Sequence, residues 1–78
     1  MPKPWTAGSV KSWHGDEGWG VLTSQDVVGD VWVHFSDILG EGFRELAKGE
    51  PVEFRYEDRQ QDGYSHAATV VRRIGTGA

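Results

Sequence analysis

The sequence predicts an all-β protein, a small five-stranded antiparallel barrel of Greek-key topology. Its 78 residues suffice for one domain over residues 1–78, with the barrel at about 6–74 and flexible ends. Apolar and polar residues alternate over short stretches, which is typical of strands, and no stretch keeps a helical period. A long connection interrupts the pattern after the third strand. Five short strands with such a connection are typical of a small closed barrel.

Three predicted strands occupy the first half of the chain. The first covers residues 6–13 and is followed by a turn at residues 14–17. The second covers residues 18–23, where two glycines at alternate positions favour strong coiling or close backbone approach. A loop at residues 24–29 leads to the third strand at residues 30–35.

A long connection and a fourth strand follow. Residues 36–49 fit neither period over any length, so we expect a helical turn or two, anchored by Ile38 and Leu46. The fourth strand covers residues 51–57. The side chains that its alternation directs inward are Val52, Phe54 and Tyr56.

The fifth strand completes the barrel. A polar turn is predicted at residues 58–63, where charged and amide side chains lead to an Asp-Gly pair. The strand that follows covers residues 64–74 and is built around Ala68 and Val70. At the other end of the chain, Trp5 is expected to rest on the barrel exterior.

The composition narrows the class of function. A net charge of −4, from 12 acidic and 8 basic residues, is unlike the basic surface of proteins that bind duplex DNA. Without cysteine or metal-ligand spacing, no disulfide, metal or other cofactor is expected. No apolar run suits a signal peptide or membrane span, so we predict a cytoplasmic protein without a membrane partner. Four tryptophans make ring stacking the natural mode of binding.

Residues 18–35 carry the most informative pattern. Alternation places Trp19 on the face of Val21, and Trp32 on the face of His34. The opposite face is aliphatic and suits a core, so the rings fall where a sheet usually exposes polar groups. In an antiparallel meander of the first three strands, one outer surface would hold Lys11, Trp13, Trp19, Val21, Trp32 and His34.

Two short motifs in these strands resemble those of a known family. Residues 17–22 read Glu-Gly-Trp-Gly-Val-Leu, and residues 31–35 read Val-Trp-Val-His-Phe. They are similar to the ribonucleoprotein motifs Lys-Gly-Phe-Gly-Phe-Ile and Val-Phe-Val-His-Phe of the bacterial cold-shock protein family. Further matches at residues 8–11, 42–46 and 49–54 follow in the same order. The chain is identified as a divergent member, with a cold-shock domain.

The resemblance implies both a fold and a function. The fold is a five-stranded barrel of the oligonucleotide/oligosaccharide-binding type. The function is binding of single-stranded RNA or DNA by base stacking, as an RNA chaperone or regulator of gene expression. A monomer without a small-molecule substrate is expected. The nucleic-acid-binding residues carried over by position are Lys11, Trp13, Trp19, Asp30, Trp32, His34, Phe35 and Phe43.

The chain departs from the family pattern at three positions of the implied binding surface. Ser12 stands where the family has a tryptophan, which removes a stacking ring. Glu17 replaces the motif lysine, and Val21 replaces the second motif phenylalanine. These changes keep a second hypothesis open, a protein-interaction barrel with weakened nucleic-acid binding. No catalytic set of side chains is visible, so no enzymatic activity is predicted.

Several of the implied binding residues have a structural alternative. Trp13 either stacks on a base or folds over the space left by Ser12. Lys11 either contacts a phosphate or is only solvated. Asp30 either accepts a hydrogen bond from a base edge or simply begins a strand. Phe43 either packs against the barrel or clamps the bound strand.

The other four are interpreted as exposed binding rings. Core packing is the alternative for Trp19 and Trp32, but the opposite face already supplies a core, so we expect both indoles to be exposed. His34 has no metal-ligand or catalytic partner at suitable spacing, so we expect it to stack or hydrogen-bond. Alternation places Phe35 on the buried face of its strand, whereas the resemblance implies that an edge of its ring is exposed.

Overall fold

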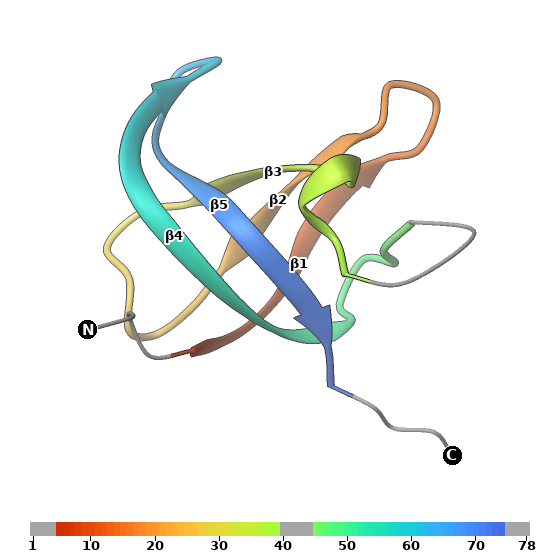
Figure 1. The fold of residues 1–78 in the computed structure, drawn as a ribbon, viewed down its shortest axis with the longest axis horizontal. Helices are drawn as coiled ribbons and strands as arrows, with labels where there is room; N and C mark the ends of the chain where they lie inside the picture. Colours follow the sequence, from red (N-terminus) through yellow and green to blue (C-terminus); the bar gives the residue numbers. More distant parts are fainter. Residues whose placement is uncertain (1–4, 40–44, 75–78) are drawn as a thin grey trace.

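Five strands close into a barrel in the order β1-β2-β3-β5-β4 (Figure 1). The computed structural model describes residues 5–39 and 45–74, so Phe43 and the ends expected to be flexible lie outside the described residues. The all-β barrel prediction is confirmed. The elements are β1 (Thr6–His14), β2 (Trp19–Thr23), β3 (Val31–His34), the 3-10 turn η1 (Phe35–Asp37), β4 (Pro51–Gln61) and β5 (Tyr64–Arg73).

The barrel is closed by a short parallel contact between β3 and β5. The other strand pairs, β1–β2, β2–β3, β1–β4 and β4–β5, are antiparallel. The β3–β5 contact consists of the register pairs Val31–His66 and Trp32–Ala67. It is therefore the shortest seam of the barrel, whereas β4 and β5 form a long arched hairpin (Figure 1).

The core inside the barrel is aliphatic apart from one phenylalanine. Its buried cluster includes Val10, Leu22, Val31, Val33, Val52, Phe54, Ala68 and Val71. Tyr56 packs against this cluster, so the predicted inward face of β4 is confirmed. Ile38 and Leu46 are also buried, as predicted for the anchors of the connection. Burial of this apolar area supplies most of the stability that so small a domain has.

A bulge in β1 changes which side chains reach the outer face. Val10 and Ser12 pair with consecutive residues of β2, so Lys11 is an extra residue in the strand. An extra residue reverses the alternation beyond it. Trp13 consequently packs against the core cluster, and His14 takes the outer position. The predicted placement of Trp13 on the outer face is wrong for this reason.

A second bulge has the same effect in β5. Thr69 lies between the register pairs of Ala68 and Val70 and has no partner of its own, and its hydroxyl donates to the Arg55 carbonyl at 3.3 Å. Beyond this bulge the alternation shifts, so Val71 is fully buried and Val70 is only half-buried. The prediction that β5 is built around Val70 is corrected to Val71.

The β4–β5 hairpin extends beyond its predicted end. Strand pairing continues to Gln61 and Tyr64, and the turn contains only Asp62 and Gly63. Their φ angles of 51° and 88° are both positive, as in the tight hairpin turns whose twist matches the flanking strands. The predicted turn at residues 58–63 is therefore too long. Its polar residues belong to an exposed strand end.

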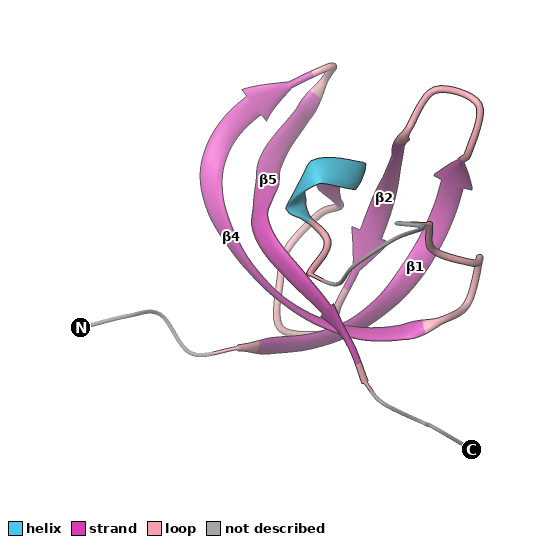
Figure 2. Cartoon of the chain, turned by 45° about the vertical axis from the view of Figure 1, so that its right-hand side comes forward, coloured by secondary structure: helices cyan, strands magenta, loops and turns pink. Residues whose placement is uncertain are grey.

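The helical turn predicted in the connection is present and begins at Phe35, one residue before the predicted connection (Figure 2). Two bonds close its start: the His34 N–H donates to Asp37 Oδ2 at 3.1 Å, and the Ser36 N–H donates to His34 Nδ1 at 3.2 Å. This capping ends β3 at His34 and begins η1 at Phe35. Among the described residues, no helix is long and apolar enough to span a membrane.

Candidate nucleic-acid interface

The site begins with two stacked rings on neighbouring strands. His14 ends β1 and pairs in register with Trp19, which begins β2. Their ring centroids are 4.2 Å apart, with 28° between the ring planes. The turn between them is held by the N–H groups of Glu17 and Gly18, which donate to the His14 carbonyl at 3.1 and 2.8 Å. A tight turn thus brings the imidazole onto the indole.

A second group of rings lies on β3 and η1. Trp32 and His34 are two residues apart on one face, with ring centroids 5.9 Å apart and 19° between planes. His34 also contacts Phe35, at 4.4 Å and 45°. Trp19 is the register partner of His34, which joins the two groups. We call these five rings the platform: His14, Trp19, Trp32, His34 and Phe35.

The platform rings differ in how much surface they offer. Phe35 is 42% exposed, while His14, Trp19 and His34 are half-buried. Trp32 is only 9% exposed, so its expected exposure is wrong. In the sheet it lies between Val21 and Ala67, whose small side chains leave room for the indole to settle.

Burial of Trp32 has a cost in hydrogen bonding. Its Nε1 is buried and has no partner among the described residues. Val21 beside it is 2% exposed, so the position of the missing motif ring is itself covered. The accessible part of the platform is therefore the line from His14 through Trp19 to His34 and Phe35.

Gly18 shapes the edge of the platform at Phe35. The Phe35 N–H donates to the Gly18 carbonyl at 2.8 Å. A Cβ on Gly18 would lie 2.9 Å from Phe35 Cδ1, and the φ of Gly18 is +77°. Only glycine satisfies both conditions without strain. The motif glycine thus lets the phenyl ring lie against the turn while keeping an exposed edge.

Glu17 has a direct contact with the platform. Its Oε1 accepts a hydrogen bond from Trp19 Nε1 at 3.0 Å. The carboxylate therefore holds the indole in place, although its charge stands where the family has a lysine. Because Glu17 is exposed, this negative charge faces any phosphate that approaches the edge of Trp19.

Lys11 and Asp30, both predicted to bind nucleic acid, bind each other. Lys11 Nζ lies 2.8 Å from Asp30 Oδ2. The hydrogen bond to Asp30 and its negative charge raise the pKa of Lys11 above 10.5. The lysine remains charged and exposed, but its charge is largely compensated.

Trp13 lies behind the platform rather than on it. Its ring packs so closely over Gly20 that a Cβ there would collide with Trp13 Cε3. Its Nε1 is buried without a partner in the described part of the chain. The structure therefore favours packing for Trp13, whereas Phe43 lies outside the described residues.

His14 is a platform ring that the sequence pattern does not predict, because the pattern assigns it to a turn. Strict alternation from the start of β1 puts Trp13, not His14, on the outer face. The bulge at Lys11 exchanges the two. No residue type in the sequence marks this bulge, so strand pairing was the only signal that could locate it.

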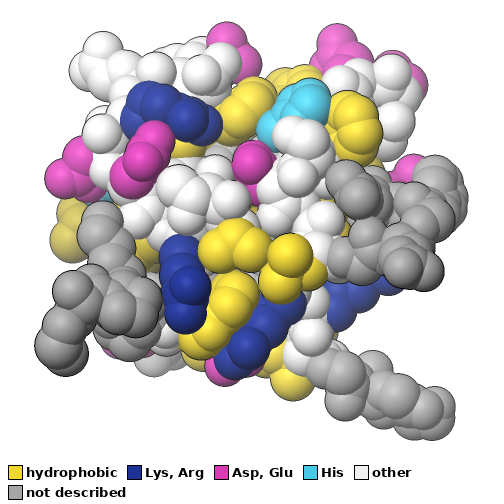
Figure 3. Space-filling view, in the orientation of Figure 1, with side chains coloured by type: hydrophobic (Ala, Val, Ile, Leu, Met, Phe, Trp, Pro, Cys, Tyr) yellow, Lys and Arg dark blue, Asp and Glu magenta, His cyan; other side chains and the backbone are white. Residues whose placement is uncertain are grey.

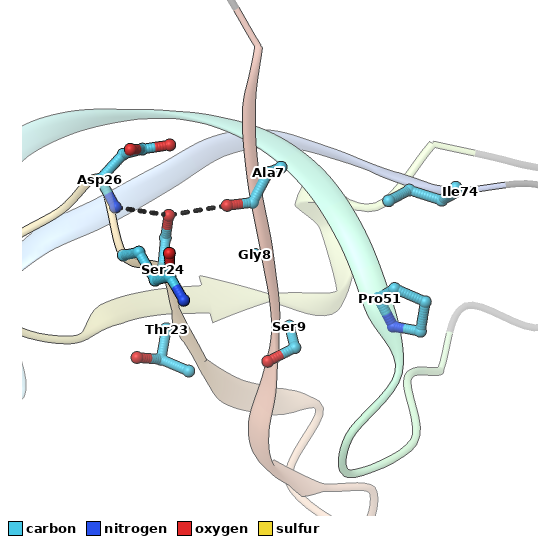
Figure 4. A pocket seen from close by; sticks show the side chains of 9 residues that line it. Ala7, Gly8, Ser9, Thr23, Ser24, Asp26, Pro51 and Ile74 are labelled. Atoms are coloured by element: carbon cyan, nitrogen blue, oxygen red, sulfur yellow. Dashed lines mark hydrogen bonds between the residues drawn. The ribbon is translucent and has the colours of Figure 1, made fainter.

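The described residues hold no other evident chemical site. They contain no group of three or more His, Cys, Asp or Glu side chains placed to hold a metal. A pocket at the opposite end of β1 is lined by Ala7, Ser9, Thr23 and Ser24, among others (Figure 4). There the Ser24 hydroxyl donates to the Ala7 carbonyl at 2.7 Å and accepts from the Asp26 N–H at 3.1 Å. These bonds tie the loop after β2 to β1.

Comparison with known proteins agrees with the fold and the motifs. The family model described as the 'Cold-shock' DNA-binding domain matches residues 6–73. A cold shock-like protein of Aquifex aeolicus (strain VF5) is 44% identical over 68 residues, 87% of this chain and 93% of that protein. The cold shock-like protein CspC of Escherichia coli (strain K12) is 46% identical over 54 residues, 69% of this chain and 78% of that protein. The chain therefore belongs to the cold-shock domain family.

Proposed function

We propose that this protein binds single-stranded RNA or DNA by stacking bases on the platform, as an RNA chaperone or regulator of gene expression. The observation that carries the proposal is the arrangement of four rings on one face: His14 stacks on Trp19, Trp19 is the register partner of His34, and His34 contacts Phe35. Neighbouring rings on adjacent strands can receive successive bases of a flexible strand. The family membership supports nucleic acid as the ligand.

Stacking must supply most of the affinity. Each stacked base contributes about 1–3 kcal/mol, so three strongly stacked bases can reach the roughly 8 kcal/mol of micromolar binding. Phosphate attraction is weak because Asp30 compensates Lys11 and Glu17 is negative. Each phosphate neutralised on a single strand contributes about −0.7 to the salt slope. We therefore expect a shallow slope that reflects one or two contacts.

The test is quenching of tryptophan emission by a short oligothymidine across a salt series. Trp5→Phe removes an emitter that contacts Arg55 and Arg72 away from the platform, and serves as the background. In this background, Trp19→Phe should reduce the quenching while a labelled oligonucleotide still binds. Absence of both quenching and oligonucleotide binding at tens of micromolar protein would refute the proposal.

A protein-interaction barrel is the second candidate. It is favoured by the compensation of Lys11 and by the exposed apolar side chains of Phe35 and Leu39, which are 42% and 54% exposed. Such a surface suits the apolar centre of a small interface. Capture of partners from lysate before and after nuclease treatment separates the two functions. Partners that survive nuclease but are lost in Trp19→Ala would favour this candidate.

A further inference from the structure

Two of the three histidines of the chain lie on the platform. Histidine is the side chain that changes charge between about pH 5 and pH 8. The third, His66, lies at the β3–β5 seam, where its Nδ1 is 2.9 Å from Asp58 Oδ1 and its Nε2 is 3.1 Å from the Val28 carbonyl oxygen. Tyr56 meets the His66 ring edge-on. His66 is thus engaged in holding the barrel together.

The two platform histidines differ in what their nitrogens do. His34 Nδ1 accepts a hydrogen bond from the backbone N–H of Ser36 and lies 2.7 Å from Ser36 Oγ. A proton on His34 Nδ1 would therefore break the hydrogen bond that caps η1. Asp37, bonded to the His34 N–H, is the carboxylate on that side. The ring nitrogens of His14 have no hydrogen-bond partner within the described residues. A proton on His14 disturbs no existing bond.

The neighbourhood of His14 combines the face of an indole with the carboxylates of the turn that follows. From β2 it meets the face of Trp19, and an imidazolium over an indole gains a cation–π interaction. The turn that follows carries Asp16 and Glu17, both exposed. Glu45, from the connection, lies near Gly15 of the same turn. Because these carboxylates repel phosphate, a positive charge on His14 would offset them where a strand crosses Trp19.

We propose that His14 is a binding residue of the platform and that its protonation strengthens single-strand binding as the pH falls. This inference rests on the proposed function and adds its regulation. In the charged form, both ring nitrogens are N–H donors, and His14 offers a phosphate a contact that Lys11, held by Asp30, supplies only weakly. In the neutral form, His14 only supports the ring of Trp19.

The experiment measures oligothymidine binding at about pH 5.5 and about pH 7.5, each across a salt series, because thymine itself does not titrate in this range. The wild-type protein should bind roughly three- to tenfold tighter at the lower pH. Its salt slope should steepen by about 0.7, the contribution of one phosphate contact. His14→Asn should lose most of both changes, and His14→Lys should bind tightly at both pH values.

His66→Asn is the matched control, because it removes a histidine that lies off the platform. It should keep the pH response of the wild type, and circular dichroism at both pH values verifies that each variant is folded. Equal wild-type affinity at the two pH values would overturn the inference, as would an unchanged response in His14→Asn. Absence of binding at both pH values would instead overturn the proposed function itself.

Discussion

Two regions of the barrel each carry a tryptophan, Trp5 in one and Trp19 in the other, and the two indoles have different neighbours. On the β4–β5 face, Arg55 and Arg72 lie over the Trp5 ring, with their guanidinium carbons 4.5 and 3.9 Å from its centroid. Figure 3 shows hydrophobic and basic side chains side by side over these strands. On the platform, Trp19 instead contacts the ring of His14 and the carboxylate of Glu17.

The side chains around each indole determine whether its ring is covered or partly open to solvent. Arg72 is paired with Glu53 at 2.9 Å, and its guanidinium and that of Arg55 lie over the Trp5 ring, which joins the chain start to the barrel. This confirms the expected place of Trp5 on the exterior. Trp19 is supported by an imidazole in a line of rings that remains partly open to solvent. The second arrangement is the one on which the proposed base stacking depends.

The largest expected effect separates two rings of the platform itself. Trp32→Ala should lower the free energy of unfolding by about 3 kcal/mol, because a buried indole leaves a cavity when it is removed. Trp19→Ala should cost about 1 kcal/mol or less, because Trp19 is only half-buried. Urea unfolding measures both. Equal losses would show that the two rings are packed alike.

The next effect concerns binding and compares the two faces directly. Trp19→Ala should weaken oligothymidine binding by about 1–3 kcal/mol, the value of one base–aromatic stack. Trp5→Ala should leave the affinity unchanged, because its ring is covered by arginines away from the platform. Anisotropy of a labelled oligonucleotide measures both. A loss of affinity in Trp5→Ala would place part of the interface on the β4–β5 face.

Trp5→Ala should instead change stability. Loss of the contacts with Arg55 and Arg72 should lower the free energy of unfolding by about 0.5–1 kcal/mol, typical of cation–π pairs at exposed sites. Thermal unfolding measures this loss, with Trp5→Phe as the control that keeps an aromatic ring. If both variants match the wild type, the arginine stack contributes nothing to stability.

A smaller effect is expected at the negative edge of the platform. Glu17→Gln keeps an oxygen that can accept from Trp19 Nε1 and removes the charge. Oligothymidine affinity should therefore rise by about twofold at low salt, with the difference fading as salt screens the charge. Titrations at low and high salt measure this. Weaker binding in the variant would show that the Glu17 carboxylate takes part in recognition.

The smallest effect is expected for the pair of Lys11 and Asp30. The hydrogen bond to Asp30 and its negative charge raise the pKa of Lys11, so whatever the pair adds to stability is lost as the pH rises through the raised pKa of folded Lys11. Because Lys11 is exposed, Lys11→Met should not measurably change thermal stability at neutral pH. A clear loss there would mean that the pair is screened less than its exposure indicates.

Much of the site was predictable because it depends on local alternation. Alternation places Trp19 and His34 on the same face of neighbouring strands, and in the structure they are register partners. The aliphatic face with Leu22, Val31 and Val33 became core for the same reason. Trp32 was misjudged because alternation indicates the side of the sheet, whereas exposure depends on how neighbouring side chains cover it.

The sequence by itself determined the barrel, its five strands along the chain and the family, because these follow from residue periodicity and from motifs in register. Only the tertiary structure decided which rings reach the surface. The bulge at Lys11 arises from pairing with β2, and it moves Trp13 inward and His14 outward. Trp32 lies in register between Val21 and Ala67 and is only 9% exposed. Both outcomes depend on strands distant in sequence, which no local pattern records.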